Sequence, residues 1–470
     1  MYSVNSWRKG VCFVKCAMTQ GAQWKHILLF ALPIMAGNLL QQLYNIADSV
    51  IVGNFVGQTA LSAVGTCAPM TILFIAFALG MSNGSAVIVA QYFGAGRRDE
   101  LRQAVSTTLI LLICLGLGIS VIAIGFARPL LAVIMGVPEP ALSLAVVYYR
   151  VYSVGLVFQF AYNITAAILR AIGDSKATLY FLLVSAITNV LLDLLFVGVL
   201  EWGVAGAAVA TVIAQALSAV VSVVYMFRRH EMLRFRRAEF RFHKDMGLLA
   251  LKLGVPTSLQ QCVVSFGHIA IQRVINSFGE GLMAASTVEI RLQQLIAVPA
   301  IAFQAGMSTF TGQNIGAEKP ERIPGGYHAT LGMSAGICLV LSVLAWVFAE
   351  PLVVMFGVEP AHQALAVEYV RFAAYCYVLF PLYQTTAGLL SGAGDVLVIA
   401  LLTLGSLGVR TVATYIMAYL TPIGHAAAWI SMPISWGLAL LISVLRYRFG
   451  SWKQKSVIKV KTGVKSGANN

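Results

Sequence analysis

Charged residues are scarce in this chain, and acidic residues are the scarcest. Only 11% of the 470 residues are charged and 18 are Asp or Glu, whereas 59% are hydrophobic and the mean hydropathy is +0.82. Soluble domains carry about 25% charged residues, so this composition excludes a soluble protein. The short alternating strands of a membrane β-barrel are also missing. Apolar stretches of about 20 residues recur instead, and each can cross a membrane as a helix.

Metal, nucleotide and enzyme motifs are missing as well. The seven cysteines include no CxxC pair or His/Cys cluster, and no GxxxxGK[ST] loop is present to bind ATP. The Asp-rich motifs of prenyl transfer and the metal or serine signatures of intramembrane proteases are absent too. We therefore expect a protein that is not an enzyme and that uses no cofactor and no metal other than a possible coupling sodium ion.

Twelve helices account for the apolar stretches, and their loops are charged on one side only. Of the 32 Lys and Arg residues, 25 lie in the two tails and in alternate loops, and one, Arg128, lies on the opposite side. Positive residues stay in the cytoplasm, so we expect a multi-pass protein of the plasma membrane (the cell inner membrane) with both termini cytoplasmic. The expected helices lie near 25–52, 59–93, 103–126, 142–169, 177–199, 204–227, 247–277, 283–314, 324–348, 363–390, 397–420 and 425–446.

The two halves of the chain repeat each other. Pro33, Gln91, Tyr162 and Asp174 recur as Pro256, Gln313, Tyr383 and Asp395, at offsets of 223 to 221 residues. Such repeats predict two lobes with the substrate site between them, and six helices in each half give both lobes one orientation. The expected parts are an N-terminal tail (1–24), an N-lobe (25–228), a basic connector (229–246), a C-lobe (247–448) and a basic tail (449–470). Residues 1–17 are expected to be a disordered tail or to follow a misplaced start codon.

Ionisable groups inside a membrane span are costly, which makes them functional candidates. On the first helix, Gln41, Tyr44, Asn45 and Asp48 share one face at helical spacing. Asn189 and Asp193 share a face of the fifth helix, and Thr211 on the sixth adds a hydroxyl. Two carboxylates, an amide and a hydroxyl can hold a proton or a hard cation such as sodium; the alternative is a network that only joins helices. Pro33 predicts a kink in the first helix, either static or bending when Asp48 changes charge.

The second half lacks this set. At the same offsets, Arg410 replaces Asn189 and Thr414 replaces Asp193. Its polar span residues include Gln260, Gln261, His268 and Gln384, which we expect to face a substrate cavity together with Gln41, Tyr44 and Asn45. Glu289 stands two residues before Arg291, so an internal pair between them is expected.

These residues resemble the multidrug and toxic compound extrusion (MATE) family, in its DinF-like branch. The resemblance rests on the stretch from Leu39 to Gly53, on the repeated Gln-x-x-Gly-Ala at Gln91 and Gln313, and on the repeated Gly-Asp at 173–174 and 394–395. It implies two six-helix lobes around a V-shaped cleft and export of amphipathic, often cationic drugs against inward proton or sodium flow. It also implies a cation site at Asp48, Asn189, Asp193 and Thr211, and a first helix that bends at Pro33 on protonation. On helices 7 and 10, Gln260, Gln261 and Gln384 lie where the NorM-like branch has acidic residues. The resemblance therefore implies no cation site of that kind in the second half.

The alternative to a drug antiporter is a flippase for a lipid-linked sugar or another lipid-like substrate. A flippase would need a basic groove for a diphosphate, for which Arg150, Arg371 and Arg410 are the candidates. We expect small amphipathic substrates and membrane lipids as partners, a monomer, and no nucleic acid. The basic connector should contact anionic lipid head groups.

Overall fold

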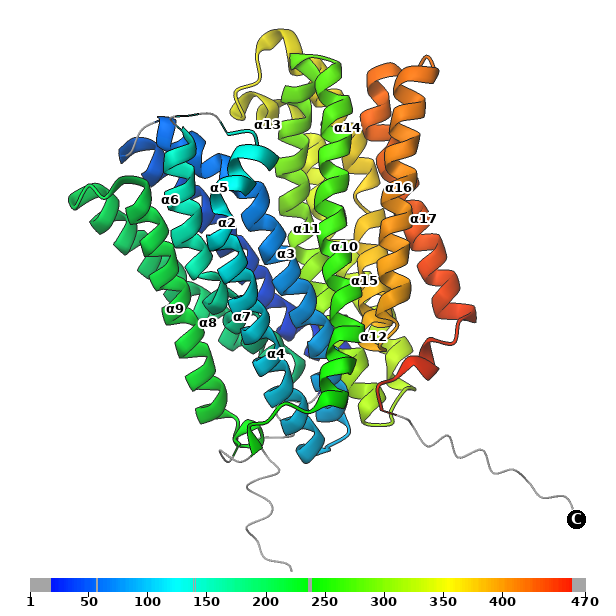
Figure 1. The fold of residues 1–470 in the computed structure, drawn as a ribbon. Coiled ribbons are helices and arrows are strands. Elements are labelled where there is room, and N and C mark those ends of the chain that lie inside the picture. The colour runs from blue at the N-terminus through cyan, green and yellow to red at the C-terminus, as the bar shows by residue number, and fades with distance from the viewer. Residues whose placement is uncertain (1–17, 56–57, 138, 140, 236–238, 459–470) are drawn as a thin grey trace, which may run out of the picture.

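The structure is a computed structural model that describes residues 18–55, 58–137, 139, 141–235 and 239–458. Side chains at 45–50, 52–54, 58–64, 68, 134 and 268 lie outside this description. The expectation for residues 1–17 therefore lies outside the described residues. The described part is all-helical and contains no strand (Figure 1).

The first half contains every helix expected there, with two additions on one loop. Short helical turns, α5 (Ala127–Pro129) and the π-helical η1 (Leu130–Ile134), follow the third span. The remaining elements are α2 (Gln23–Phe55), α3 (Gln58–Gly94), α4 (Arg98–Gly125), α6 (Ala141–Val154), α7 (Leu156–Ala171), α8 (Ser175–Asp193), the π-helical η2 (Leu194–Val199) and α9 (Gly203–Arg229).

The second half repeats this plan after a basic connector that contains the 3₁₀ turn η3 (Glu231–Leu233). Its elements are α10 (Lys244–Ser277), α11 (Glu280–Gly316), α12 (Arg322–Val347), α13 (Ala349–Met355), α14 (Pro360–Cys376), α15 (Leu379–Gly392), α16 (Val396–Leu420), η5 (Gly424–Ala426), α17 (Ala427–Phe449) and η6 (Trp452–Lys455). We call α2–α9 the N-lobe and α10–α17 the C-lobe.

The predicted fourth and tenth helices are wrong in one respect, because each is broken. The α6–α7 pair bends by 43° at Gly155, and the α14–α15 pair bends by 40° at Tyr377–Val378. These breaks are 222 residues apart, so the bend is part of the repeat. Nine described helices are long and apolar enough to span a membrane, or eleven if each bent pair is one span. The polar α10 has 34 residues and fills the remaining place in the predicted series of twelve.

The turns before α8 and α16 show how the Gly-Asp motif works. Gly173 has φ +97° and Gly394 has φ +93°, a left-handed conformation that glycine adopts without a steric penalty. The side chain of Asp174 then caps α8 by accepting a hydrogen bond from the backbone N of Ala177 at 3.3 Å. Asp395 takes the same place before α16 and pairs with Arg446 at 2.7 Å.

The two lobes exchange the first halves of their leading helices. The start of α2, with Ile27 and Phe30, is buried in a core made mostly of C-lobe residues such as Phe303 and Phe310. The start of α10, with Leu253, is buried in the core of the N-lobe. The lobes defined by chain order are therefore tied together by an exchange of helical segments.

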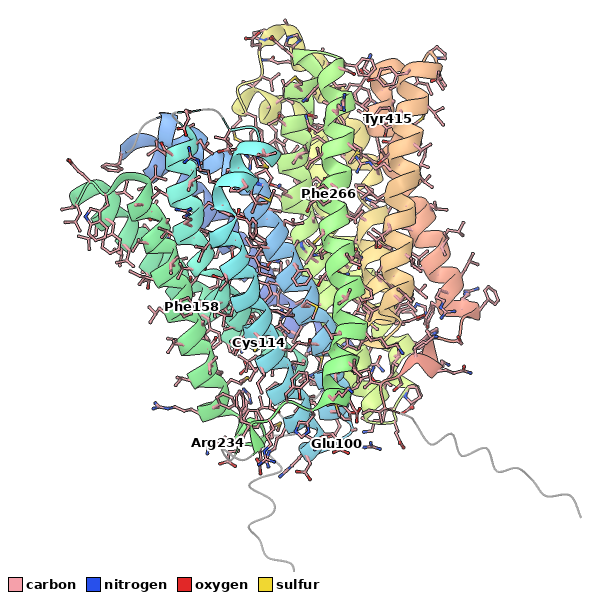
Figure 2. The ribbon with its side chains drawn as sticks, in the orientation of Figure 1. Glu100, Cys114, Phe158, Arg234, Phe266 and Tyr415 are labelled. Atoms are coloured by element: carbon pink, nitrogen blue, oxygen red, sulfur yellow. The ribbon has the colours of Figure 1, made fainter. Side chains whose placement is uncertain are left out.

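The two ends of the bundle carry different segments of the chain. The connector η3, the α3–α4 turn and the C-terminal segment lie at one end, which we call the basic end, and α13 lies at the other (Figure 1). Glu100 and Arg234 mark the basic end, and Tyr415 on α16 lies towards the opposite end (Figure 2). The helices of the two lobes diverge from the basic end towards the end that carries α13 (Figure 1).

Candidate functional site

Asn189, Asp193 and Thr211 form a buried polar cluster inside the N-lobe. Asp193 is 0% exposed, Asn189 1% and Thr211 8%. One end of the Asn189 amide lies 2.8 Å from Oδ2 of Asp193, and the other end lies 3.3 Å from Oγ1 of Thr211. The structure therefore brings together three of the four residues predicted for the cation site. Their assembly follows from the four-residue spacing on α8 and from the packing of α8 against α9.

The amide of Asn189 suits both protonation states of Asp193. With its nitrogen towards the carboxylate, it donates to Oδ2 at 2.8 Å, while its oxygen accepts from the Thr211 backbone N at 3.3 Å. With its oxygen on that side, it can accept from a protonated carboxyl group, and its nitrogen donates to Thr211 Oγ1 at 3.3 Å. Rotation of one amide thus gives a hydrogen-bonded arrangement for either state.

The backbone changes geometry directly after Asp193. The α-helix ends there and the π-helical turn η2 follows, with Leu200 N donating to the carbonyl of Leu195 at 2.8 Å. π-helical turns are rare and frequently occur at functional sites. The position of Asp193 at this junction supports a functional role for the cluster.

The side chains of Asp48 and Asn45 lie outside the described residues, but the helix packing fixes the level of position 48. Gly37 of α2 faces Leu182 of α8, and further along Ile51 packs with Val197. Both helices start at the basic end and run in the same direction. Eleven residues, about three helical turns, separate Gly37 from Asp48 and Leu182 from Asp193, so position 48 lies level with Asp193. Nearby on α2, Gln41 is exposed and Tyr44 is partly buried.

Pro33 lies within α2, which continues as one helix from Gln23 to Phe55. Its side chain is partly buried. The proline therefore does not interrupt the helix in this structure, and its predicted bending on protonation remains a prediction.

Two of the polar residues predicted in the C-lobe, Gln260 and Gln384, form side-chain hydrogen bonds there. Gln260 donates to Thr403 Oγ1 at 2.7 Å, and the hydroxyl of Tyr383 also bonds Thr403, at 2.6 Å. Gln384 donates to Gln304 at 3.2 Å. Gln261 is partly buried and its carbonyl accepts from Ser265 at 3.3 Å, and His268 lies outside the described side chains. Thr403 and Gln304 were missed, although the repetition of Tyr162 as Tyr383 was a signal for this region.

The predicted pairing of Glu289 with Arg291 is wrong. Glu289 is 2% exposed and accepts a hydrogen bond from the hydroxyl of Tyr377 at 3.0 Å, whereas Arg291 is exposed. Residues two apart on a helix do not face each other, so the two side chains point to different sides of α11. Glu289 instead interacts electrostatically with Arg410 of α16, which is also buried.

The repeated Gln-x-x-Gly-Ala motifs join the lobes at the basic end. Gln91 of α3 donates to the carbonyl of Gly392 in the C-lobe at 3.0 Å, and Gln313 of α11 donates to the carbonyl of Ala171 in the N-lobe at 2.8 Å. Each of these carbonyls ends a broken span, α15 or α7. We call Gln91 and Gln313, with the carbonyls they bind, the glutamine clasp.

The glycines of the same motifs allow the helices to approach this closely. A side chain at Gly94 would overlap the backbone carbonyl of Gln313, and one at Gly316 would overlap the carbonyl of Gln91. The remaining amide oxygens of the clasp are bonded too, by the backbone N of Val457 and of Met18, each at 2.8 Å. Hydrogen bonds continue across the lobes as far as Ser258, near the middle of α10.

A profile of the MatE family matches residues 33–195 and 256–416, once in each half of the chain. This chain belongs to the MatE family. The MATE resemblance predicted from the sequence is thereby confirmed, and the duplicated match agrees with the repeat. The MatE chain is a multi-pass membrane protein of a family of multidrug efflux transporters.

Relatives of this MatE protein carry transporter names. The probable multidrug resistance protein YpnP of Bacillus subtilis (strain 168) is 30% identical over 443 residues, which cover 94% of this chain and 99% of the relative. The FAD transporter of Shewanella oneidensis is 25% identical over 347 residues, covering 71% of this chain and 74% of the relative. These names are consistent with a protein that is not an enzyme.

A solved structure has nearly the same arrangement of helices. It is described as the outward-facing conformation of a multidrug resistance MATE family transporter of the MOP superfamily. Its TM-score is 0.86 at 26% identity, covering 93% of this chain and 98% of that chain. The MatE chain shares with it the arrangement of two lobes.

Proposed function

We propose that this MatE protein is a proton-coupled antiporter that exports amphipathic, cationic drugs or toxic metabolites by alternating access. The observation that carries the proposal is the Asn189–Asp193–Thr211 cluster, a carboxylate enclosed in one lobe of a two-lobed bundle. A charge at this depth costs about 2.5–3.5 kcal/mol, so a role in ion uptake explains its presence better than a role in joining helices. Asp48, level with Asp193 on α2, is the second coupling carboxylate.

Protons fit the cluster better than sodium. The amide of Asn189 touches Asp193 directly at 2.8 Å and can bond either protonation state. A hard cation takes several oxygen ligands and would have to enter between the Asn189 amide and Asp193, which lie only 2.8 Å apart. Sodium bound by Asp48, Asn189, Asp193 and Thr211 is the alternative, in which the amide oxygen is a ligand.

The closed basic end supports the conformational part of the proposal. The glutamine clasp and the contact of Gly94 with Gln313 seal the lobes at this end, and the helices diverge at the other. In this outward-facing state, protons reach Asp193 and Asp48 and the drug leaves. The lobes then rock, the clasp opens, and proton release to the cytoplasm regenerates the carboxylates that favour a new cationic drug.

The energetics of one proton per drug are adequate. A monovalent cationic drug that leaves in exchange for one proton moves no net charge, so the pH difference across the membrane drives the exchange. Each pH unit corresponds to about 1.4 kcal/mol and supports roughly a tenfold drug gradient. No ATP-binding loop is required.

The arginines give little support to the flippase. Arg371 pairs with Glu350 at 3.0 Å and lies over Trp346, while Arg410 is buried inside the C-lobe and interacts with Glu289. Arg150, on α6, belongs to the other lobe. These engagements leave no common groove for a diphosphate built from the three residues.

We further propose that the protein works as a monomer in the plasma membrane, with the basic end in the cytoplasm and in contact with anionic head groups. The one-sided charge distribution supports this orientation. A cysteine introduced at Glu318, in the α11–α12 turn, should react with an impermeant maleimide only after the cells are opened.

Vesicles with imposed gradients test the proposed function. The purified protein is reconstituted, and export of a cationic dye is followed under a pH gradient alone, a sodium gradient alone, and neither. We expect the pH gradient alone to drive transport. Transport driven only by the sodium gradient would show that sodium, and not the proton, is the coupling ion. Movement of a labelled lipid-linked sugar between the leaflets without dye export would favour the flippase.

A further inference from the structure

The C-lobe encloses a cation that the proposed cycle does not use. Arg410 of α16 is 7% exposed, and its Nε atom is buried without a hydrogen-bond partner. Glu289 of α11 interacts with it electrostatically, and so does Tyr369 of α14. Tyr377, at the bend between α14 and α15, donates to Glu289 at 3.0 Å. Residues of three spans, α11, the broken span α14–α15 and α16, thus lie around one buried pair of opposite charges.

This pair occupies the place in the C-lobe that corresponds to the proposed proton site. At the repeat offset of 221, Arg410 replaces Asn189 and Thr414 replaces Asp193. The surroundings correspond too, because α16 packs between α10 and α17 as α8 packs between α2 and α9. The sign of the charge on this helix is therefore reversed between the lobes.

The chemistry of arginine determines the charge state of Glu289. A guanidinium group stays protonated at all physiological pH values, and a buried charge without a counter-ion is strongly destabilising. Of the described groups that interact with Arg410, Tyr369 is a neutral phenol and Glu289 is the acid. Glu289 compensates Arg410 only as a carboxylate, and a carboxylate oxygen can accept the hydrogen bond that the hydroxyl of Tyr377 donates at 3.0 Å.

We propose that Arg410 is a permanent internal cation of the C-lobe, which neutralises Glu289 and prevents this lobe from taking up a coupling ion. The N-lobe site takes up and releases a proton in each cycle. The C-lobe site does neither, because Arg410 already supplies its positive charge. This assignment makes Arg410 a residue that determines how many ions are coupled to each transported drug. It rests on the proposed function only in taking the N-lobe acids as the coupling site.

Infrared spectroscopy tests the charge state without requiring transport. A protonated carboxylic acid has a carbonyl band separate from the carboxylate bands, and the spectrum of Glu289→Gln subtracted from wild type isolates the contribution of Glu289. At neutral pH we expect no acid band in wild type. The spectrum of Arg410→Met, with that of Arg410→Met/Glu289→Gln subtracted, should show the acid band. A loss of about 1.4 kcal/mol of interaction already changes the ratio of protonated to ionised Glu289 tenfold.

Two outcomes would overturn the inference. An acid band from Glu289 in wild type would show that Arg410 does not keep it ionised. Absence of the band in Arg410→Met would show that something other than Arg410 holds the charge. If Arg410→Met does not fold, the wild-type and Glu289→Gln spectra still decide whether Glu289 is ionised in wild type. Arg410→Lys, which keeps the positive charge, is the matched control.

The coupling ratio separates this inference from the proposed function. In vesicles, the ratio of protons to dye should rise by one in Arg410→Met and stay unchanged in the double variant and in Arg410→Lys. An unchanged ratio in Arg410→Met would contradict the role of Arg410 in coupling. If Asp193→Asn retains normal coupling while the spectra come out as expected, the proposed proton site fails and the charge assignment in the C-lobe stands.

Discussion

Replacement of Asp193 by asparagine should uncouple transport and leave the fold intact. The side chain is 0% exposed and lies 2.8 Å from the amide of Asn189. Asparagine has nearly the same shape and keeps one hydrogen bond to that amide, but it cannot take up or release a proton. Asp193→Asn therefore removes the proposed chemistry without opening a cavity.

The magnitudes of the opposing effects on stability are similar. Exchanging a charge-assisted hydrogen bond of about 1.5–3 kcal/mol for a neutral one of about 1 kcal/mol weakens the contact by about 1–2 kcal/mol. Removing a charge from a span recovers up to about 2.5–3.5 kcal/mol. The net change is small, so the apparent unfolding temperature should move by only a few degrees. The drug gradient, by contrast, should fall from roughly tenfold per unit of imposed pH difference to none.

Dye accumulation in proteoliposomes under an imposed pH gradient measures this loss. Thr414→Ala is the matched control, since Thr414 holds the corresponding place on α16 and is equally buried. The control should transport like wild type. Normal dye gradients with Asp193→Asn would refute the reasoning, and so would an unfolding temperature far below that of wild type, because the loss of transport would then be structural.

Three further predictions concern other parts of the molecule. Thr211→Val removes the hydroxyl that Asn189 bonds at 3.3 Å and should raise the proton concentration for half-maximal efflux only about threefold. If the variant instead needs more than about ten times the sodium concentration for half-maximal efflux, sodium is the coupling ion. Gly316→Ala should push the lobes apart at the basic end, at a cost of about 1–3 kcal/mol in stability. Spin labels placed on the two lobes at that end should therefore report longer distances. The control Gly118→Ala, which has open space around it, should leave these distances unchanged. Burial raises the pKa of Asp174, but hydrogen bonds from His230, Tyr225 and the backbone of Ala177 outweigh it and lower the pKa below its ordinary value. Its contribution of about 1 kcal/mol is then complete above about pH 4 and is lost as the pH falls through the lowered pKa, so the destabilisation caused by Asp174→Asn should disappear in acid; a destabilisation independent of pH would contradict this.

The helices were largely predictable because apolar length and one-sided charge are strong signals. The expected helix 59–93 is Gln58–Gly94, and 283–314 is Glu280–Gly316. The breaks at Gly155 and Tyr377 were not predicted. Apolar runs continue through both positions, and the close approach of Gln215 to Gly155 joins residues 60 positions apart in the chain. Hydropathy does not report such contacts.

The candidate site was predictable where its residues are close along one helix. Asn189 and Asp193 follow from helical spacing, and Thr211 from a neighbouring helix. The partners of Glu289 were not predictable in this way, because Tyr377 and Arg410 lie 88 and 121 residues further along the chain. Local spacing suggested Arg291 instead, although a position two residues away on a helix faces another direction.

A comparison between the halves separates the mechanical parts of this transporter from its chemical parts. The residues that recur, such as Gln91 and Gln313, hold the lobes to each other through equivalent bonds to Gly392 and Ala171. A rocking motion requires such matched contacts on both sides, and so the repeat retains them. Ion uptake requires only one site, and a second site would change the number of ions per drug. Coupling should therefore be sought at positions where the two lobes differ. Asn189 in the N-lobe and Arg410 at the corresponding position of the C-lobe are such a pair.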